Sequence, residues 1–276
     1  MISVNEFPNK TFATKEDLYD ALKLHEKDLI AQKKMRLKEC DAVSTSFSFV
    51  DSKGEAVKAD TIDSTEVDKI RAKLIINTTN LFDSHNDVHI NGIWTKTLKE
   101  VRDLYLLKQH SMTFESIISD EIKAKAENTT FRDLGYKLDG NTQALAFYSV
   151  IEKDRNPYMF EQYAKGRVKN HSVGMRYVKL SLAINTELES DKKYKDVWDK
   201  YYPSIANKED VDAKGYFWAV TEAKLIEGSA VVKGSNWATP TQSIEEIKTE
   251  AGSTTSKHDE NEPSSDTHEL ININLY

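Results

Sequence analysis

The chain has 276 residues, 39% hydrophobic and 30% charged, with 10 glycines and 5 prolines, which excludes a fibrous or wholly disordered protein. The net charge of −7 gives no reason to expect phosphate-driven nucleic-acid binding. A single cysteine, Cys40, excludes an intramolecular disulfide framework and a Cys-rich zinc site. Because no apolar run approaches the roughly 20 residues that span a bilayer, and the first residues lack a signal-peptide pattern, we expect a soluble intracellular protein.

The acidic charge is concentrated at the C-terminus. Residues 243–276 hold eight acidic and two basic side chains and so carry −6 of the −7. This segment is rich in Ser, Thr and Glu, has few apolar residues and shows no periodicity, so we predict a disordered acidic tail. Its last residues, LININLY (270–276), are apolar again and form a candidate docking peptide.

The first half of the chain alternates between helical and strand patterns. Thr14 is the predicted N-cap of the first helix, because Lys15, Glu16 and Asp17 follow it directly. The expected elements are a helix over 14–39, strands over 43–50, 73–79 and 87–94, and a helix over 96–109.

In the second half, Asn156 and Pro157 predict the start of a short helix. The other expected elements are strands over 144–151 and 172–184, a charged helical insertion over 185–212, and one or two strands over 215–232. Short strands mixed irregularly with helices indicate an α+β fold with a largely antiparallel sheet or barrel.

Asp83, His85, Asp87 and His89 form the first cluster with chemical potential. On a strand, this alternation would place two carboxylates and two imidazoles on one face, an arrangement that can bind a divalent metal. The competing interpretation is a polar turn, which the neighbouring Asn-Asp and Asn-Gly pairs favour. We therefore assign no metal ligand and expect no cofactor.

His110 and Ser172 are the other candidates. His110 ends an apolar run, where it serves either as a general base or as a helix-terminal histidine that the helix dipole favours. Ser172 lies beside Gly174 at the start of a predicted strand. It is either an ordinary strand serine or a nucleophile, and a nucleophile needs a base that a third group orients.

Four segments, in order, resemble the tailed-phage prohead maturation proteases, which belong to the same superfamily as the herpesvirus assemblins. The first is NLFDSHNDVHINGIWTKTLKE (80–100), which is similar to the family's D-S-x-x-D-V turn, strand and helix. LLKQHS (106–111) resembles the element that carries the catalytic histidine, and VKNHSVGMRYVK (168–179) resembles the strand that carries the nucleophile. The last segment is VTEAKLIEGSAVVKGSNWATPT (220–241).

The resemblance implies a serine endopeptidase with Ser172 as the nucleophile and His110 as the general base. Glu227 occupies the place of the third triad member and would orient His110. Glu222 is a nearby competitor for that role. His171 ranks lower, because adjacent strand residues point to opposite faces.

The oxyanion donor is left open by the resemblance, because the loop Lys233–Trp237 has no arginine where the herpesvirus relatives have one. The candidates are Asn236, Arg176 and the backbone N–H groups near Gly234. The implied fold is a partly open antiparallel β-barrel surrounded by helices. Its domains would be an N-terminal helical extension (1–45), a protease domain (46–242) with the insertion, and the acidic tail (243–276).

The partners that the resemblance implies are the major capsid protein and the scaffold protein as substrates, together with the protease itself. The implied location is the host cytoplasm, inside the phage procapsid. Self-association into a dimer or higher oligomer is expected, without membrane or direct nucleic-acid binding. We hypothesise that one or both extensions tie the enzyme to the scaffold or shell and are trimmed on maturation. The alternatives are a non-catalytic capsid assembly or scaffold protein with the same fold, and a metal-dependent hydrolase centred on residues 83–89.

Overall fold

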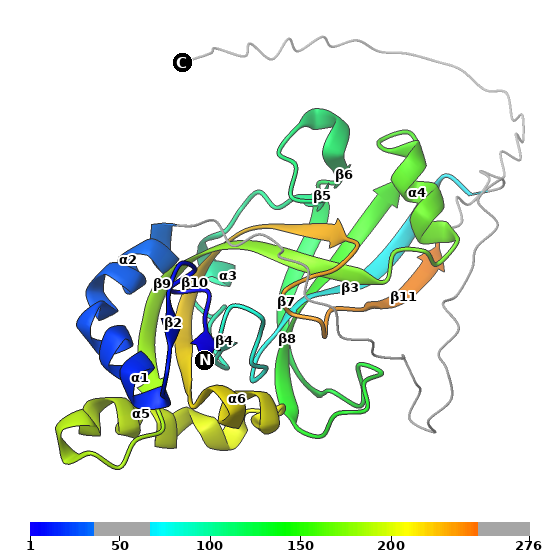
Figure 1. The fold of residues 1–276 in the computed structure, drawn as a ribbon. Helices are drawn as coiled ribbons and strands as arrows, with labels where there is room; N and C mark the ends of the chain where they lie inside the picture. The colour runs from blue at the N-terminus through cyan, green and yellow to red at the C-terminus, as the bar shows by residue number, and fades with distance from the viewer. Residues whose placement is uncertain (36–66, 248–276) are drawn as a thin grey trace, which may run out of the picture.

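A computed structural model describes residues 1–35 and 67–247 of the chain (Figure 1). The helices are α1 (Lys15–Leu24), α2 (Glu26–Met35), α3 (Thr97–Glu100), α4 (Pro157–Ala164), α5 (Lys192–Tyr201) and α6 (Lys208–Lys214), with the 3-10 turns η1 (Phe114–Ser116), η2 (Glu189–Asp191) and η3 (Tyr202–Ser204). The strands are β1 (Ile2–Ser3), β2 (Thr11–Phe12), β3 (Lys69–Thr78), β4 (Asp87–His89), β5 (Leu106–Lys108), β6 (Ile117–Ser119), β7 (Glu121–Thr130), β8 (Asn141–Glu152), β9 (Asn170–Ile184), β10 (Tyr216–Val231) and β11 (Thr241–Glu246).

Two main sheets form the α+β body. One has the order β11-β3-β8-β7 and is antiparallel throughout. The other is built around β10, which pairs with β9 in antiparallel orientation and with β4 and β5 in parallel orientation. Over residues 1–35 and 67–247 neither sheet closes into a barrel, and the sheet around β10 includes parallel pairs, so the α+β class is confirmed and the partly open antiparallel barrel is not.

β9 and β10 are the two longest strands in the described part of the chain, and they pair to form a long two-stranded ribbon (Figure 1). Its register runs from Tyr216 opposite Ile184 to Val231 opposite Asn170, with β-bulges near Val220 and Leu225. The ribbon is long enough for one half of β10 to pair with β4 and the other half with β5. The predicted strand over 172–184 and a strand over 215–232 are thereby confirmed.

The N-terminal segment packs on the body. Thr14 caps α1 as predicted: its hydroxyl accepts from the Asp17 N–H, and the Asp17 carboxylate accepts from the Thr14 N–H. The buried side chains of this segment, Leu18 and Leu22 among them, share one hydrophobic cluster with residues of β9 and β10. Residues 1–35 are therefore a part of the main core.

The charged region after β9 is helical, as predicted. Its buried side chains, chiefly Trp198 and Val211, pack with Phe217 of β10 in a second cluster. The Trp198 ring stacks on Tyr202 at a centroid distance of 4.7 Å and lies 5.3 Å from Phe217. This aromatic contact fixes the insertion to one end of the ribbon (Figure 1).

Three local predictions are wrong. The single helix expected over 14–39 is interrupted at His25, between α1 and α2. The helix expected over 96–109 ends at Glu100, and residues 106–108 form β5, because both Leu106 and Leu107 are buried beside β10. Tertiary pairing outweighs the helical spacing here. The strand expected over 87–94 stops at His89, where the chain turns through Gly92 at a φ of 89°.

The boundary predicted for the acidic tail, residue 243, lies inside a strand of the structure. Residues 243–246 belong to β11, which pairs with β3 and buries Ile244. The strand expected over 43–50 and residues 248–276 lie outside the described residues. In the described ranges, no helix is both long and apolar enough to cross a membrane.

Candidate active site

His110 sits at a tight turn directly after β5. The pairing of Lys108 with Ala230 holds the end of β5 against β10, and the Gln109 N–H donates to the Ala230 carbonyl at 3.0 Å. Gln109 and His110 then adopt left-handed φ values of 53° and 57°. Non-glycine residues in this region are strained and are common at functional sites. The turn directs the His110 side chain back onto β10.

The His110 imidazole contacts the Glu227 carboxylate. Nδ1 of His110 lies 2.6 Å from Oε1 of Glu227, and the two side chains are only 6% and 2% exposed. An ionised carboxylate can only accept, so the imidazole donates from Nδ1, and in the neutral form of the ring the lone pair is then on Nε2. Nε2 is buried and has no hydrogen-bond partner among the described residues. This is the tautomer that a general base requires.

Sequence reasoning missed two residues that hold this pair. Ser229 is fully buried; its hydroxyl donates to Oε2 of Glu227 at 2.6 Å and accepts from the His110 N–H at 3.0 Å. Gly174 lies opposite Glu227, and a Cβ at this position would come 2.0 Å from Oε1 of Glu227. Glu227 and Ser229 are two residues apart on a predicted strand, so their side chains share one face. This spacing could have indicated from the sequence that Ser229 contacts Glu227.

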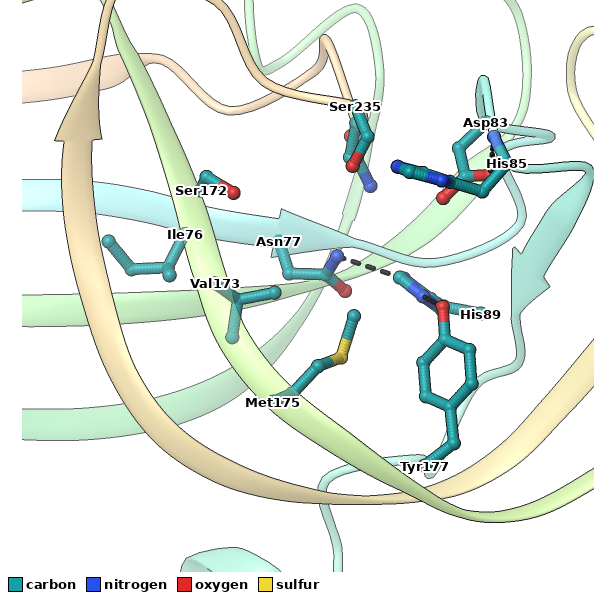
Figure 2. Close-up of a pocket in the computed structure, with 11 residues that line it drawn as sticks. Ile76, Asn77, Asp83, His85, His89, Ser172, Val173, Met175, Tyr177 and Ser235 are labelled. Atoms are coloured by element: carbon teal, nitrogen blue, oxygen red, sulfur yellow. Dashed lines mark hydrogen bonds between the residues drawn. The ribbon is translucent and has the colours of Figure 1, made fainter. Parts of the chain in front are cut away.

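Ser172 lies beside the pair. It is directly opposite Ser229 in the β9–β10 register, so its side chain leaves the ribbon on the same face as Ser229 and Glu227. Ser172 is 7% exposed and lines a small pocket with Asn77, His85 and Ser235 (Figure 2). No hydrogen bond joins Ser172 to His110 in the described residues. The structure thus brings His110 and Glu227 into contact, with Ser172 as their neighbour.

The two competitors of Glu227 are engaged elsewhere. Glu222 forms ion pairs with Lys179 at 2.5 Å and with Lys96 at 3.5 Å, and the hydrogen bond from Lys179 contributes most to lowering the pKa of Glu222. His171 is fully buried between the Thr239 carbonyl and the Tyr163 hydroxyl, at 3.2 and 3.0 Å. Burial lowers the pKa of His171 to about 4, so this side chain is neutral at physiological pH.

Of the oxyanion candidates, the loop 233–236 reaches Ser172 and Arg176 does not. A Cβ at Gly234 would lie 3.8 Å from the Cβ of Ser172, and Asn236 lines the same pocket as Ser172. Asn236 donates to the Thr78 carbonyl at 2.7 Å and accepts from the Thr78 hydroxyl at 2.9 Å, which ties the loop to β3. Arg176 is exposed and faces Lys224 across the ribbon.

Residues 83–89 form a turn and a short strand. Asp83 accepts from the backbone N–H groups of His85 and Asp87, at 2.8 and 3.0 Å, so it does not share a strand face with the other three residues. Asp87 pairs with the buried Lys33 at 2.6 Å. Over residues 1–35 and 67–247 no group of three or more His, Cys, Asp and Glu side chains is arranged to hold a metal ion. These contacts favour the polar-turn interpretation.

Comparison of the chain with protein-family models, with curated proteins and with solved structures gives no match. The interpretation of the site therefore rests on its own geometry and on the motifs in the sequence.

Proposed function

We propose that this protein is a serine endopeptidase in which Ser172 is the nucleophile, His110 the general base and Glu227 the group that orients His110. The observation that carries the proposal is the 2.6 Å contact between His110 Nδ1 and Glu227 Oε1, with Nε2 left without a partner. Two buried strands and a strained turn produce this contact from residues 117 positions apart.

The reaction is acyl transfer to water. As Ser172 Oγ attacks a peptide carbonyl, His110 Nε2 takes the hydroxyl proton, and Glu227 stabilises the imidazolium. His110 then gives the proton to the leaving amine, and the C–N bond breaks. Water attacks the resulting ester with His110 again as the base, which releases the acid and restores Ser172.

A nucleophilic Ser172 needs a base within reach in the substrate complex and donors for the oxyanion. Catalytic hydrogen bonds are often long in free enzymes and tighten with substrate, so the missing Ser172–His110 bond is consistent with a free state. The backbone N–H groups of Gly234 and Ser235 donate no hydrogen bond within the described part of the chain, and their loop packs on Ser172. They are the donors that we assign to the oxyanion.

The proposed substrates are scaffold and major capsid polypeptides and the enzyme itself, cleaved inside a phage procapsid during head maturation. The support for this setting is the ordered resemblance of four sequence segments to prohead proteases. The second candidate function is a non-catalytic assembly protein, which the missing Ser172–His110 hydrogen bond favours.

Co-expression of the chain with its capsid and scaffold proteins tests the proposal. We expect processing in the wild type and none with Ser172→Ala. Glu227→Gln should slow processing by about 10³- to 10⁴-fold, since a neutral amide cannot stabilise the imidazolium. Glu222→Gln is the matched control on the same strand and should process normally.

Processing that survives Ser172→Ala would refute the serine mechanism. Correct shell assembly by Ser172→Ala, with no cleavage by the wild type, would support the non-catalytic function.

A further inference from the structure

The pocket beside Ser172 is lined by buried polar atoms that have no hydrogen-bond partner among the described residues. It has a volume of about 10 Å³, room for one water-sized group, and Figure 2 shows Ser172 at one end and His85 at the other. Two polar atoms of its lining residues are buried and make no hydrogen bond in the described ranges: Oδ1 of Asn77 and Nε2 of His85. Asn77 is only 1% exposed. Buried polar atoms of this kind normally have a partner, so the pocket is built to receive one.

A chain of buried hydrogen bonds fixes the orientation of the Asn77 amide. Tyr177 donates its hydroxyl proton to Oδ2 of Asp87 at 2.8 Å, so its oxygen accepts from Nε2 of His89 at 3.0 Å. Nδ1 of His89 lies 2.9 Å from Nδ2 of Asn77. An amide nitrogen can only donate, so Nδ1 of His89 is the acceptor of this contact. The amide nitrogen therefore faces His89, and the carbonyl oxygen of Asn77 is left to face the pocket.

The chain of hydrogen bonds begins in the N-terminal segment. Lys33 of α2 donates to Oδ1 of Asp87 at 2.6 Å and lies 3.5 Å from Oε1 of Glu6. Burial works to lower the pKa of Lys33, but the charges of Asp87 and Glu6 outweigh it and raise the pKa. Burial and the charge of Asp87 also hold the pKa of Tyr177 well above its usual range. Tyr177 thus keeps its proton, which it donates to Asp87.

We propose that Asn77 determines specificity by accepting a hydrogen bond from a small donor group of the substrate in the pocket beside Ser172, and that Lys33 positions Asn77 through Asp87, Tyr177 and His89. The proposal deepens the peptidase function and rests on it. The donor is a hydroxyl or N–H group of a substrate residue next to the scissile bond. A carboxylate is excluded, because it presents only acceptors to Oδ1 of Asn77.

The expected selectivity follows from burial. A site that is built to hydrogen-bond a substrate hydroxyl rejects an analogue without it, because the buried acceptor is then unpaired. A serine-containing peptide should therefore exceed its alanine counterpart in kcat/KM by at least about tenfold, and a threonine-containing peptide should exceed its valine counterpart.

Cleavage of a mixed peptide library by the full chain identifies the selected position, and matched peptide pairs then measure the ratio. Asn77→Leu should remove the selectivity and bring the ratio of kcat/KM near one. Lys33→Met should reduce the ratio in the same direction, whereas Lys34→Met, at the exposed next position of α2, should keep the wild-type ratio. An unchanged ratio in Asn77→Leu, or a wild type that shows no preference for donors, would overturn the proposal.

A crystal structure of the full chain at atomic resolution tests the pocket without any peptide. We expect a water within hydrogen-bond distance of Oδ1 of Asn77 and Nε2 of His85. An Asn77 amide turned to place its nitrogen in the pocket would overturn the proposal. If the wild type cleaves no peptide, the peptidase function fails, and this measurement still decides the orientation of Asn77.

Discussion

Ser229 connects the two members of the His110–Glu227 pair, because its hydroxyl contacts both the Glu227 carboxylate and the His110 backbone. Its position on β10 fixes the carboxylate from one side while the turn after β5 fixes the imidazole. The pairing of His110 with Glu227 therefore depends on a residue that takes no part in proton transfer. The same logic makes Gly174 necessary, since any side chain there would displace Glu227.

Removal of this hydroxyl should affect stability and catalysis together. Ser229→Ala leaves the buried His110 N–H without its acceptor, so we expect a loss of about 1–3 kcal/mol in the free energy of unfolding and a lower kcat. Ser149→Ala is the matched control, because the Ser149 hydroxyl is equally buried and has no partner among the described residues. Urea unfolding and peptide cleavage measure both effects. Equal losses in the two variants would contradict this role of Ser229.

His171 makes the stability of the protein depend on pH. Its pKa is about 4 in the folded protein and about 6.5 in an unfolded chain, so the unfolded state binds more protons between these values. Stability is therefore complete above about pH 6.5 and is lost as the pH falls toward 4, by about 3 kcal/mol in all.

Urea unfolding from pH 7 to pH 4 measures this loss. His171→Asn should flatten the pH dependence by that amount, since an amide does not titrate in this range. His25→Asn, at an exposed position, should keep the wild-type slope. A wild-type slope in His171→Asn would show that other groups cause the pH dependence.

At the scale of elements, β11 marks the end of the ordered sheet. It forms the outer strand beside β3 and buries Ile244. A chain that ends at residue 247 keeps every described contact and is the reference for a shorter truncation. A chain that ends at residue 240 exposes the edge of β3 and should melt at a lower temperature. Equal melting temperatures would show that β11 does not stabilise the sheet.

The elements that the sequence predicted well are those whose own pattern agrees with their environment. Thr14 at the start of α1, Asn156 before α4 and the long apolar strands are local signals that tertiary packing reinforces. Leu106 and Leu107 show the opposite case, because a strand buried on both faces has no alternation and its leucines also fit a helical stripe.

The pairing of His110 with Glu227 was also predicted from the sequence, but only through the resemblance of two motifs to a known family. Pattern alone gives no distance between residues on β10 and after β5, and it gave no signal for the left-handed turn at Gln109. The path from Lys33 to Asn77 was beyond prediction, because it depends on four segments meeting in space.

For the whole molecule, the central consequence is that the N-terminal segment and the β9–β10 ribbon share one core. Leu22→Ala in α1 should lower the free energy of unfolding of the entire chain by about 2–5 kcal/mol, in a single transition. Leu24→Ala, at an exposed position of the same helix, should change it by less than about 0.5 kcal/mol. Hydrogen exchange at the β10 amides measures the coupling. Unchanged protection there in Leu22→Ala would mean that the segment folds as a separate unit.

The position of β10 in the sequence also governs when the contact between His110 and Glu227 can form. The pair needs β5 from the first half of the chain and β10 from its last quarter, and contacts so distant in sequence slow folding. A nascent chain that has not yet released residue 227 from the ribosome holds His110 but no partner for it. Under the proposed function, the chain therefore has no assembled catalytic pair during its own synthesis, and cleavage cannot begin until β10 is in place.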